Sequence, residues 1–560
     1  MTPNTNATTP VLIVGGGPVG MTLALCLAKR GIASYLIELR SADTLPDVKC
    51  NHISARSMEL FRSLGISKDL RAAGLPDDYP HDVSYRTSTL GEEIARIHIP
   101  GRNTRLTDHS GPDGHWPTPE PPHRINQRYI EPILRQHVQK SSLITCFFQH
   151  QVLAFSQDEH QVSIEVQNLQ SSDGQTFTLT ANYLVGCDGG RSMVRKGIGA
   201  KLVGDEVVQR VQSTCIRAPQ LIAQMKSPPA WAMFTVNPRR SGNIYAIDGK
   251  EVWLIHNYLR DHEVDFESVD RDWAIRTILG VDDSFEYEVM SKEDWFGRRL
   301  VSDKLQVGRV FVAGDAAHLW VPYAGYGMNA GLADASNLAW HLAAQLESWA
   351  SPQALSAYEK ERHPITEQVS RFAMNHAHAM SKRRREIPDQ LEDATPEGAQ
   401  ARAEFGKDLY DLNVQQYCCA GLNFGYFYDQ SPVILYDTET APDYSMGSFK
   451  ASTVPGCRAP HFWLAEGQSL YDALGPGYTL LCFESVESVG LSELTSQASQ
   501  AGMPLKILNL AEAQNMPPEY KHAFVVVRAD AHTVWRGNDL TPSLVQELLQ
   551  VLRGFSYGEI

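Results

Sequence analysis

The N-terminal segment combines an apolar run with glycines in a spacing that suits the binding of a pyrophosphate. Gly15, Gly17 and Gly20 form a Gly-x-Gly-x-x-Gly sequence directly after the apolar run Val11–Val14. In such a sequence the first glycine permits a tight turn, the second lets a phosphate approach the backbone, and the third lets the following helix pack against the strand. The N-terminus of that helix also offers unpaired N–H groups and a partial positive charge. The segment therefore predicts a dinucleotide site.

An acidic residue follows at the position where such a site binds a ribose. Glu38 ends a second apolar segment, Ala33–Glu38, eighteen residues after Gly20, and its carboxylate can accept hydrogen bonds from ribose hydroxyls. We also expect Arg40, two residues later, to contact the dinucleotide. Glycine turns can serve packing alone, but here a strand, a turn, the amphipathic helix Met21–Arg30, a second strand and an acid follow in register. This order favours nucleotide binding over packing.

Two later motifs indicate which dinucleotide is bound, because the glycine turn alone suits both NAD and FAD. Asp188, Gly189, Ser192 and Arg195 form an Asp-Gly-x-x-Ser-x-x-Arg sequence, and Asp315 stands in a Gly-Asp sequence after a further apolar strand. Both motifs resemble those of the FAD-dependent aromatic hydroxylases, the single-component flavoprotein monooxygenases related to phenol and p-hydroxybenzoate hydroxylases. In that family the first segment binds FAD and is associated with nicotinamide use. The resemblance implies that Asp188 contacts FAD and that Asp315 binds its ribityl chain.

The loop before the next long helix resembles the family's Pro-x-x-Gly-x-Gly-x-Asn sequence. It contains Pro322, Gly325, Gly327, Met328 and Asn329. A reduced flavin carries negative charge, and a glycine turn that leads into a helix N-terminus offers N–H groups and a positive dipole end to that charge. We expect these residues to bind the flavin, with the helix starting near Gly331. Tyr326 stands where the family more often has a small or amide residue, which predicts a narrower space beside the flavin ring.

Two further segments contain polar residues that the resemblance assigns to the cofactor. Arg56 lies in Asn51–Glu59, which is similar to the family segment whose arginine contacts FAD. Gln127 lies in Arg124–Glu131, which is similar to the segment whose glutamine does so. Arg56 could instead form a salt bridge on a helix surface, since such pairs are common.

The resemblance implies a monooxygenase reaction with non-covalently bound FAD. NADH or NADPH binds transiently and passes a hydride to FAD, dioxygen adds at C4a, and the hydroperoxide transfers one oxygen atom to a phenolic ring. The protein has to exclude water and help the phenol to lose its proton. Candidates for the proton step are His52 and Tyr258, with His256 as an alternative. A structural histidine is the competing interpretation of His52, and Pro322 is expected to place its backbone beside the flavin.

Two other functions are compatible with these motifs. One is a different FAD oxidoreductase, such as a dehydrogenase; the Trp-x-Trp-x-Ile-Pro signature of flavin halogenases is absent from the sequence. The other is a non-catalytic member of the fold that binds FAD or another ligand. The sequence does not distinguish NADH from NADPH and identifies neither the phenol, the ring position nor the catalytic base.

Composition favours a globular protein without nucleic-acid or membrane partners. The chain has 560 residues, 43% of them hydrophobic and 21% charged, and a formal net charge of −15 that would repel phosphates. No apolar run approaches the roughly 18 residues of a membrane helix, and Met1–Pro10 lacks the features of a signal peptide, so we expect a cytoplasmic location. The basic run Lys382–Arg385 is expected to end a helix. Nine scattered cysteines without a Cys-x-x-Cys sequence predict neither a metal site nor disulfides.

The pattern and the resemblance predict an α/β fold: a Rossmann-like FAD-binding domain with an inserted, mostly antiparallel substrate-binding sheet, and a C-terminal thioredoxin-like α/β domain without its Cys-x-x-Cys. In the family that last domain serves stability or subunit contact, which leaves a homodimer as one expectation. Alternation puts His256 and Tyr258 on one face of a strand and Trp253 and Ile255 on the other. The proline-rich stretch Pro112–Pro122 predicts an exposed connection. The expected ranges are residues 8–80, 110–202 and 301–385 for the FAD-binding domain, 81–109 and 203–300 for the sheet, 386–452 for a helical connection and 453–560 for the last domain.

Overall fold

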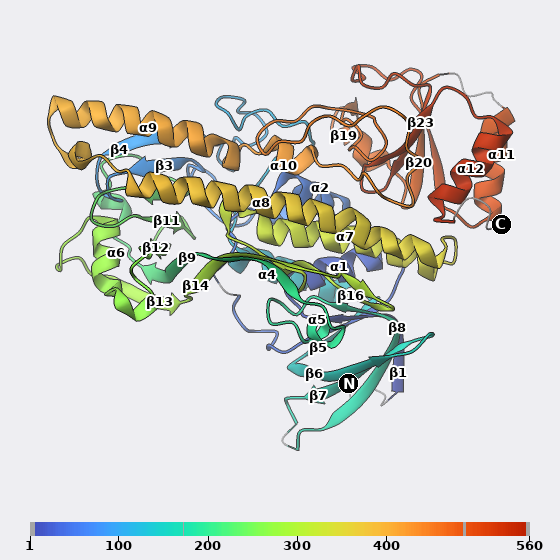
Figure 1. The fold of residues 1–560 in the computed structure, drawn as a ribbon, viewed down its shortest axis with the longest axis horizontal. Helices are drawn as coiled ribbons and strands as arrows, with labels where there is room; N and C mark the ends of the chain where they lie inside the picture. The colour runs from blue at the N-terminus through green and yellow to red at the C-terminus, as the bar shows by residue number, and fades with distance from the viewer. Residues whose placement is uncertain (1–5, 47, 172, 485–488, 556–560) are drawn as a thin grey trace.

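Two large β-sheets lie along a pair of long helices in the computed structural model (Figure 1). The structure describes residues 6–46, 48–171, 173–484 and 489–555, so the first five residues of the segment considered for a signal peptide lie outside it. The long helices are α7 (Tyr326–Leu346) and α8 (Ala357–Arg385), and they cross the middle of the molecule. The α/β class predicted from the sequence is confirmed.

The first sheet has a parallel centre that leads into the glycine turn. Its strands run in the order β15-β16-β8-β1-β2-β5, and β6 and β7 extend it beside β8. Val11, Leu12 and Ile13 of β1 are fully buried, because a strand covered on both faces is apolar throughout. β1 begins ahead of its predicted start, since residues 6–9 also pair with β8. The bounds are β1 Asn6–Val14, β2 Ser34–Glu38, β5 Ile144–Phe148, β6 His150–Gln157, β7 Val162–Asn168, β8 Thr176–Gly186, β15 Gln306–Val307 and β16 Val310–Val312.

The helices of this part begin where local capping chemistry allows. The helix after the glycine turn begins at Pro18 rather than Met21, because a proline in the first turn already has the helical φ angle. α7 begins at Tyr326 instead of near Gly331, since Gly325 takes a left-handed φ of +62° and turns the chain into the helix. The bounds are α1 Pro18–Lys29, α2 Ala55–Ser63, α3 Ser67–Arg71, α4 Gln127–Lys140 and α5 Met193–Gly197.

The second sheet is mostly antiparallel, and its two faces have different partners. Its strands run in the order β17-β14-β9-β12-β11-β10-β3-β4, and β13 pairs with β9. Trp253 and Ile255 of β12 share a core with Ile278 of α6 (Arg271–Leu279). The opposite face, with Tyr258, therefore points toward α8. The bounds are β3 Val83–Arg86, β4 Glu93–Ile97, β9 Leu202–Arg217, β10 Ala232–Thr235, β11 Gly242–Ala246, β12 Val252–Tyr258, β13 Glu288–Lys292, β14 Trp295–Ser302 and β17 His318–Leu319.

The C-terminal part contains a four-stranded sheet of order β21-β20-β22-β23 with two helices, α11 and α12. β20 and β21 are parallel, whereas β22 and β23 join antiparallel, which is the arrangement expected of a thioredoxin-like domain. Our division of the chain into residue ranges remains a proposal. The bounds are α9 Pro396–Tyr417, α10 Ala420–Phe424, β18 Trp463–Ala465, β19 Gln468–Ser469, β20 Tyr478–Cys482, α11 Val489–Gln500, β21 Leu505–Asn509, β22 Phe524–Arg528, β23 Thr533–Gly537 and α12 Pro542–Leu552.

One predicted connection differs from expectation. Pro112–Pro122 contains no helix or strand, as predicted, but its second half is buried rather than exposed. Thr118 donates to a carboxylate oxygen of Glu59 at 2.5 Å, and Glu120 pairs with Arg71 at 2.7 Å. These contacts satisfy the polar groups of the loop, so it can pack inside the protein.

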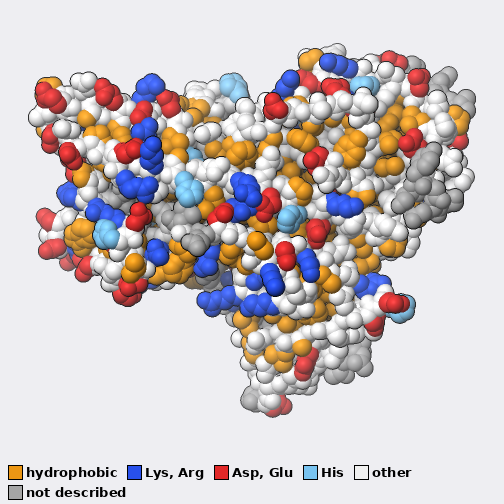
Figure 2. All heavy atoms as spheres, viewed as in Figure 1, with side chains coloured by type: hydrophobic (Ala, Val, Ile, Leu, Met, Phe, Trp, Pro, Cys, Tyr) orange, Lys and Arg blue, Asp and Glu red, His pale blue; other side chains and the backbone are white. Residues whose placement is uncertain are grey.

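In the surface view, Lys and Arg side chains gather across the narrow middle of one face, above the lobe that contains β6 and β7 (Figure 2). We call this region the basic waist. Elsewhere on this face acidic and basic side chains are interspersed. Among the described residues, no helix is long and apolar enough to cross a membrane. The waist is thus the part of this face best suited to attract an anionic molecule.

Candidate functional site

The glycine turn packs tightly against its surroundings except at its middle glycine. A Cβ atom on Gly15 would lie 2.3 Å from the carbonyl oxygen of Cys187, and one on Gly20 would lie 1.9 Å from the carbonyl oxygen of Gly15. A Cβ on Gly17 would meet no atom within 4 Å. The first and third glycines therefore serve packing, whereas Gly17 faces open space that a phosphate group can enter.

Glu38 lies beside this turn and belongs to a chain of polar contacts. One carboxylate oxygen accepts from the Gly16 N–H at 2.6 Å, and the other accepts from the backbone N–H and the Nε of Arg40, each at 2.9 Å. Arg40 also approaches Glu131 at 3.5 Å, and Glu131 accepts from the side-chain amide of Gln127 at 2.6 Å. Burial raises the pKa of Glu131. The predicted residues Glu38, Arg40 and Gln127 thus lie together, joined by Glu131, which the sequence did not single out.

Asp188 organises the second motif by capping a short helix. Its carboxylate accepts from the Ser192 hydroxyl at 2.5 Å and from the backbone N–H of Met193 at 2.8 Å, in the first turn of α5. Gly189 beside it has a φ of +77°, and a Cβ there would meet nothing within 4 Å. The capping contacts give Asp188 a structural role, and its direct contact with FAD stays a prediction.

Asp315 lies in the 3-10 turn Gly314–Ala316 at the end of β16. Its side chain is exposed, yet desolvation by the surrounding protein raises the pKa of its carboxyl, with Lys49 and His318 acting in the opposite direction. The Asp315 side chain thus reaches solvent from a position that other parts of the protein surround, and we call the space beside it the first recess. The Cys50 thiol lies at the same recess, where burial and the charge of Asp315 raise its pKa to about 12.

Asp334 of α7 forms hydrogen bonds with this turn, although the sequence did not point to it. One carboxylate oxygen accepts from the Gly314 N–H at 3.2 Å and from His318 at 2.7 Å, and the other accepts from Arg362 at 2.9 Å. Burial alone would raise the pKa of this carboxyl, but its interactions with His318 and Arg362 lower the pKa to about 2. The only signal in the sequence was that Asp334 is the single acidic residue of this helix.

The loop before α7 is held by Asn329 and His52. The Asn329 side chain accepts from the Ser54 N–H at 2.8 Å and donates to the carbonyl oxygens of Gly325 at 2.7 Å and His52 at 3.1 Å. A Cβ on Gly325 would lie 3.0 Å from Nδ1 of His52, so only glycine fits above this ring. A Cβ on Gly327 would meet nothing within 4 Å. The first turn of α7, which contains Gly327 and Met328, therefore presents backbone to open space.

Arg56 and Tyr326, the two remaining residues singled out in this region, both have partners in the C-terminal half of the chain. The guanidinium of Arg56 pairs with Glu59 at 2.8 Å and donates to the carbonyl oxygen of Asp530, in the C-terminal part, at 2.8 Å. The salt bridge considered as the alternative is therefore present, and Arg56 also lines a cavity with Asn329 at the start of α7, so its contact with FAD stays a prediction. The buried hydroxyl of Tyr326 donates to the carbonyl oxygen of Leu422 at 2.6 Å, and its effect on the space beside the flavin stays a prediction.

A group of aromatic side chains lies between the antiparallel sheet and the ends of α8 and α9, and we call the space that it borders the second recess. Its walls are aromatic, and we call the following residues the tyrosine cluster: Tyr85, Tyr245, Tyr258, Tyr323 and Tyr417. Trp231 and His256 contact Tyr245 with ring centroids 5.4 and 5.7 Å away. Tyr258 and His256 remain partly accessible, although burial raises the pKa of Tyr258 well above its ordinary value and lowers that of His256 to about 4. This combination again indicates a recess walled by protein.

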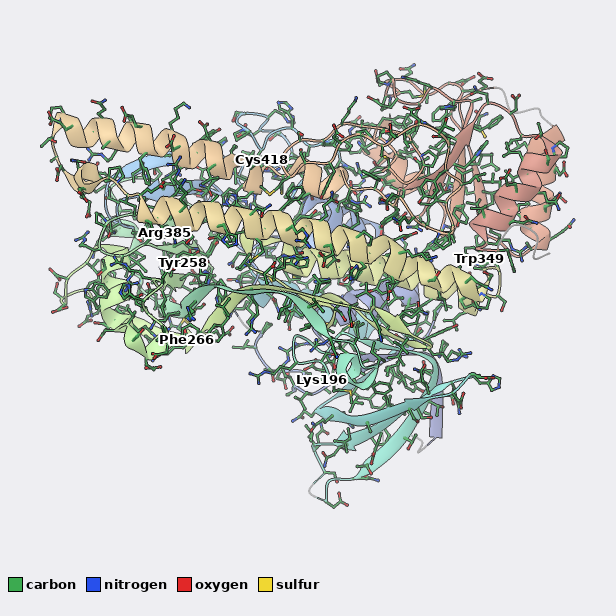
Figure 3. The ribbon with its side chains drawn as sticks, in the orientation of Figure 1. Lys196, Tyr258, Phe266, Trp349, Arg385 and Cys418 are labelled. Atoms are coloured by element: carbon green, nitrogen blue, oxygen red, sulfur yellow. The ribbon has the colours of Figure 1, made fainter. Side chains whose placement is uncertain are left out.

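The two recesses meet at one loop, which follows Pro322. Tyr323 belongs to the tyrosine cluster and stands two residues before Gly325. The Tyr258 hydroxyl donates to the Asn243 side chain at 2.5 Å, and Figure 3 shows Tyr258 beneath the end of α8, near Arg385. The predicted residues Pro322 and Tyr258 thus lie on the loop and the wall that separate a nucleotide site from an aromatic one.

The first recess fits FAD. Glycines 17, 189 and 327, from three distant segments, all leave open space, an acid stands beside the glycine turn, and a helix N-terminus faces the hollow. The open space at the glycine turn suits a pyrophosphate, the acid suits a ribose, and the helix N-terminus suits a flavin ring. No cluster of His, Cys, Asp or Glu placed to hold a metal ion occurs among the described residues.

Comparisons with known proteins agree with this geometry. A family model described as an FAD binding domain matches residues 8–373. The FAD-dependent monooxygenase apdD of Emericella nidulans is 28% identical and covers 95% of this chain and 88% of its own length. Phenol 2-monooxygenase of a Pseudomonas species is 29% identical, with coverage of 99% and 94%.

Solved structures extend the likeness to the whole fold. RebC with reduced flavin, an enzyme of rebeccamycin biosynthesis, superposes with a TM-score of 0.87 at 31% identity and covers 99% of this chain and 100% of its own. The flavin-dependent monooxygenase PieE, solved with FAD and substrate, gives a TM-score of 0.80 at 26% identity, with coverage of 97% and 98%.

The chain belongs to this family of FAD-binding proteins. It is an FAD-dependent monooxygenase of the aromatic hydroxylase class, and the cofactor predicted from its motifs is confirmed.

Proposed function

We propose that this enzyme uses NADH or NADPH and dioxygen to hydroxylate a phenolic aromatic ring. The observation that carries the proposal is the closeness of the two recesses along the chain: Tyr323 lines the aromatic recess, while Gly327, four residues later in the first turn of α7, leaves open space at the FAD recess. An aromatic ring held by the tyrosine cluster would therefore lie beside the flavin. The NAD(P)H use is typical of the family, and the basic waist in Figure 2 offers charge for its phosphates.

Bound FAD supplies hydride acceptance from the nicotinamide and activation of dioxygen. The protein supplies position and electrostatics. The N-terminus of α7 directs backbone N–H groups and a positive dipole end toward the flavin recess, where negative charge develops. The aromatic walls of the second recess exclude water from the space in which oxygen is transferred.

Several side chains are candidates to accept the proton of the phenol or to form a hydrogen bond with its oxygen. Burial raises the pKa of Tyr258 well above its ordinary value, so Tyr258 acts as a neutral hydroxyl and not as a phenolate. Burial also lowers the pKa of His256 to about 4, so its imidazole is neutral at pH 7. His52 lies under the flavin loop, against Gly325. We propose Tyr258 and His52 as the first residues to test, with His256 as a further candidate.

The function is tested with the FAD-bound protein and a panel of phenols, hydroxybenzoates and fused-ring phenols. We expect at least one compound to stimulate NAD(P)H oxidation and to yield a product that contains one atom from labelled dioxygen. A dehydrogenase would consume or form NAD(P)H without label in the product. A binding protein without activity would show no turnover, and either result would refute the proposal.

Location and assembly are also proposals. All nine cysteines are free thiols in the structure, which suits a reducing compartment such as the cytoplasm. A homodimer through the C-terminal part follows only from the family resemblance, and sedimentation of the purified protein would test it. We propose no nucleic-acid or membrane partner.

A further inference from the structure

Arg384, in the basic run that ends α8, faces the tyrosine cluster instead of the outer surface. Its guanidinium carbon lies 3.8 Å from the ring centroid of Tyr258, and its Nη2 donates to the Tyr323 hydroxyl at 3.0 Å. Its neighbours differ: Arg383 pairs with Asp408 at 3.1 Å, and Arg385 lies 3.5 Å from Asp261. Within the described part of the chain, Arg384 forms no ion pair with a carboxylate.

Arg124 brings a second positive charge to the same aromatic walls. It is buried, with 3% of its surface exposed, and its guanidinium lies over the ring of Trp231 at 4.7 Å and near that of Tyr417 at 5.9 Å. Its Nη2 donates to the carbonyl oxygen of Tyr417 at 3.4 Å. The acid with the strongest influence on its charge is Asp113. Asp113, however, already forms a buried ion pair with Arg105 at 2.5 Å.

Among the described residues, therefore, neither the half-buried Arg384 nor the buried Arg124 forms an ion pair with a carboxylate. The groups that face them from the sheet, from the flavin loop and from the end of α9 are tyrosines, and burial keeps Tyr85, Tyr258 and Tyr417 neutral by raising the pKa of each. A buried positive charge without a counterion is unfavourable, and such charges gather where a ligand supplies the opposite charge.

We propose that the substrate is an aromatic acid, whose ring lies in the tyrosine cluster and whose carboxylate is bound by Arg384, with Arg124 as the second positive charge. A planar guanidinium matches a carboxylate through paired hydrogen bonds, whereas a neutral phenol would leave both charges uncompensated. The aromatic walls account for the ring, and the arginines account for the acid. This inference rests on the proposed function, because it assigns the substrate class of the same recess.

The test uses the FAD-bound protein and two probes that differ only by a carboxylate, 2-naphthol and 3-hydroxy-2-naphthoic acid. The Kd of each is measured from the change in flavin absorbance, without NAD(P)H. We expect the acid to bind at least about tenfold more tightly than the naphthol. We expect Arg384→Gln and Arg124→Gln each to reduce this preference at least about tenfold, whereas Arg385→Gln, a neighbour on the surface, should keep it.

Equal affinity for the two probes in the unaltered protein would overturn the inference, and so would an unchanged preference in folded Arg384→Gln. The comparison in the unaltered protein decides the question even if a variant does not fold. Because binding is measured without turnover, the two proposals fail separately. Hydroxylation of neutral phenols with no preference for the acid would refute only the inference, and tight binding of the acid without any turnover would refute only the proposed function.

Discussion

The guanidinium of Arg195 donates to the carbonyl oxygen of Ala316 at 3.0 Å and so joins two motifs whose residues stand 121 positions apart. Its other nitrogen donates to the carbonyl oxygen of Gly190 at 3.1 Å. One buried side chain therefore sets the spacing between the Asp188 loop and the Asp315 turn. The sequence motif places Arg195 among the residues of an FAD-binding segment. The structure shows that its side chain positions the Asp188 loop and the Asp315 turn.

Replacing Arg195 with methionine should weaken FAD binding, because Arg195 holds the Asp188 loop and the Asp315 turn at their spacing. The change leaves the buried carbonyl oxygen of Ala316 and the half-buried one of Gly190 without this donor, which costs about 2 kcal/mol, and lets the Asp315 turn shift. We expect the Kd for FAD to rise about tenfold or more. Titration of the apoprotein with FAD measures this. Lys196→Met is the matched control, because Lys196 is the next residue of the same helix and is exposed (Figure 3); an equal effect of both variants would contradict the assignment.

Asp315→Asn should lower the affinity for FAD. The stability of the apoprotein should stay the same or increase. Desolvation raises the pKa of this carboxyl in the fold, so the ionised form destabilises the apoprotein above the ordinary pKa of 3.8. Asparagine removes that penalty but also replaces an ionised carboxylate by a neutral amide, which has one acceptor oxygen fewer and accepts more weakly from ribityl hydroxyls. We expect a Kd for FAD raised about tenfold and an apoprotein Tm at pH 7 that is unchanged or higher. A variant that loses both FAD and apoprotein stability would show that Asp315 is structural.

The glycines of the FAD recess could be predicted because each meets a local requirement. Gly15 has a φ of +107° and Gly20 touches the carbonyl oxygen of Gly15, and such requirements leave the same short sequence in any protein that makes this turn. The strand and helix that flank the turn follow from periodicity in the same way. These parts of the fold need no knowledge of distant contacts.

The directions of other side chains depend on segments far away in the sequence. Arg56 has the right type and position for a cofactor residue, and the fold also brings it to the carbonyl oxygen of Asp530, far away in the sequence, beside its ion pair with Glu59. The sequence predicts Arg384 as part of a basic helix end. Its position over the ring of Tyr258 depends on the fold. No local pattern records these pairings, so the sequence could not distinguish a ligand contact from a structural one.

Asp334→Asn should destabilise the protein at neutral pH and reduce its sensitivity to acid. The pKa of Asp334 falls from the usual 3.8 to about 2 in the fold, so its ionised form stabilises the protein above about pH 4, and this stabilisation is lost as the pH falls toward 2. Asparagine also leaves the buried Arg362 without its carboxylate, which costs about 3 kcal/mol or more. Urea unfolding followed by flavin fluorescence should show a large difference from the unaltered protein at pH 7.

At pH 3 that difference should become smaller, since the unaltered protein has then lost part of the same contribution. Glu165→Gln serves as the control, because Glu165 is an exposed carboxylate on β7. A difference between Asp334→Asn and the unaltered protein that stays constant from pH 7 to pH 3 would argue against an ionised Asp334.

The C-terminal part should depend on one buried ion pair with α8. Arg528 donates to both carboxylate oxygens of Glu361 at 2.8 Å, and Ser431 and Asn337 donate to the same carboxylate at 2.6 Å. We expect Arg528→Met to destabilise the protein by about 3–5 kcal/mol, because it leaves a buried carboxylate unpaired. Adding Glu361→Gln should restore part of that loss. Thermal unfolding of both single variants and the double variant measures the coupling, and strictly additive effects would rule it out.

His52→Ala should leave FAD bound and slow hydroxylation. The ring lies against Gly325, with 3.0 Å between Nδ1 and the position of a Cβ on that glycine, so its loss would affect the loop that separates the flavin from the aromatic recess. If His52 also takes part in the proton step, product formation should fall about a hundredfold. Product formed per NAD(P)H consumed is the measurement, with the exposed His160→Ala as control. Coupled turnover equal to that of the unaltered enzyme would remove His52 from the catalytic residues and leave it a structural histidine.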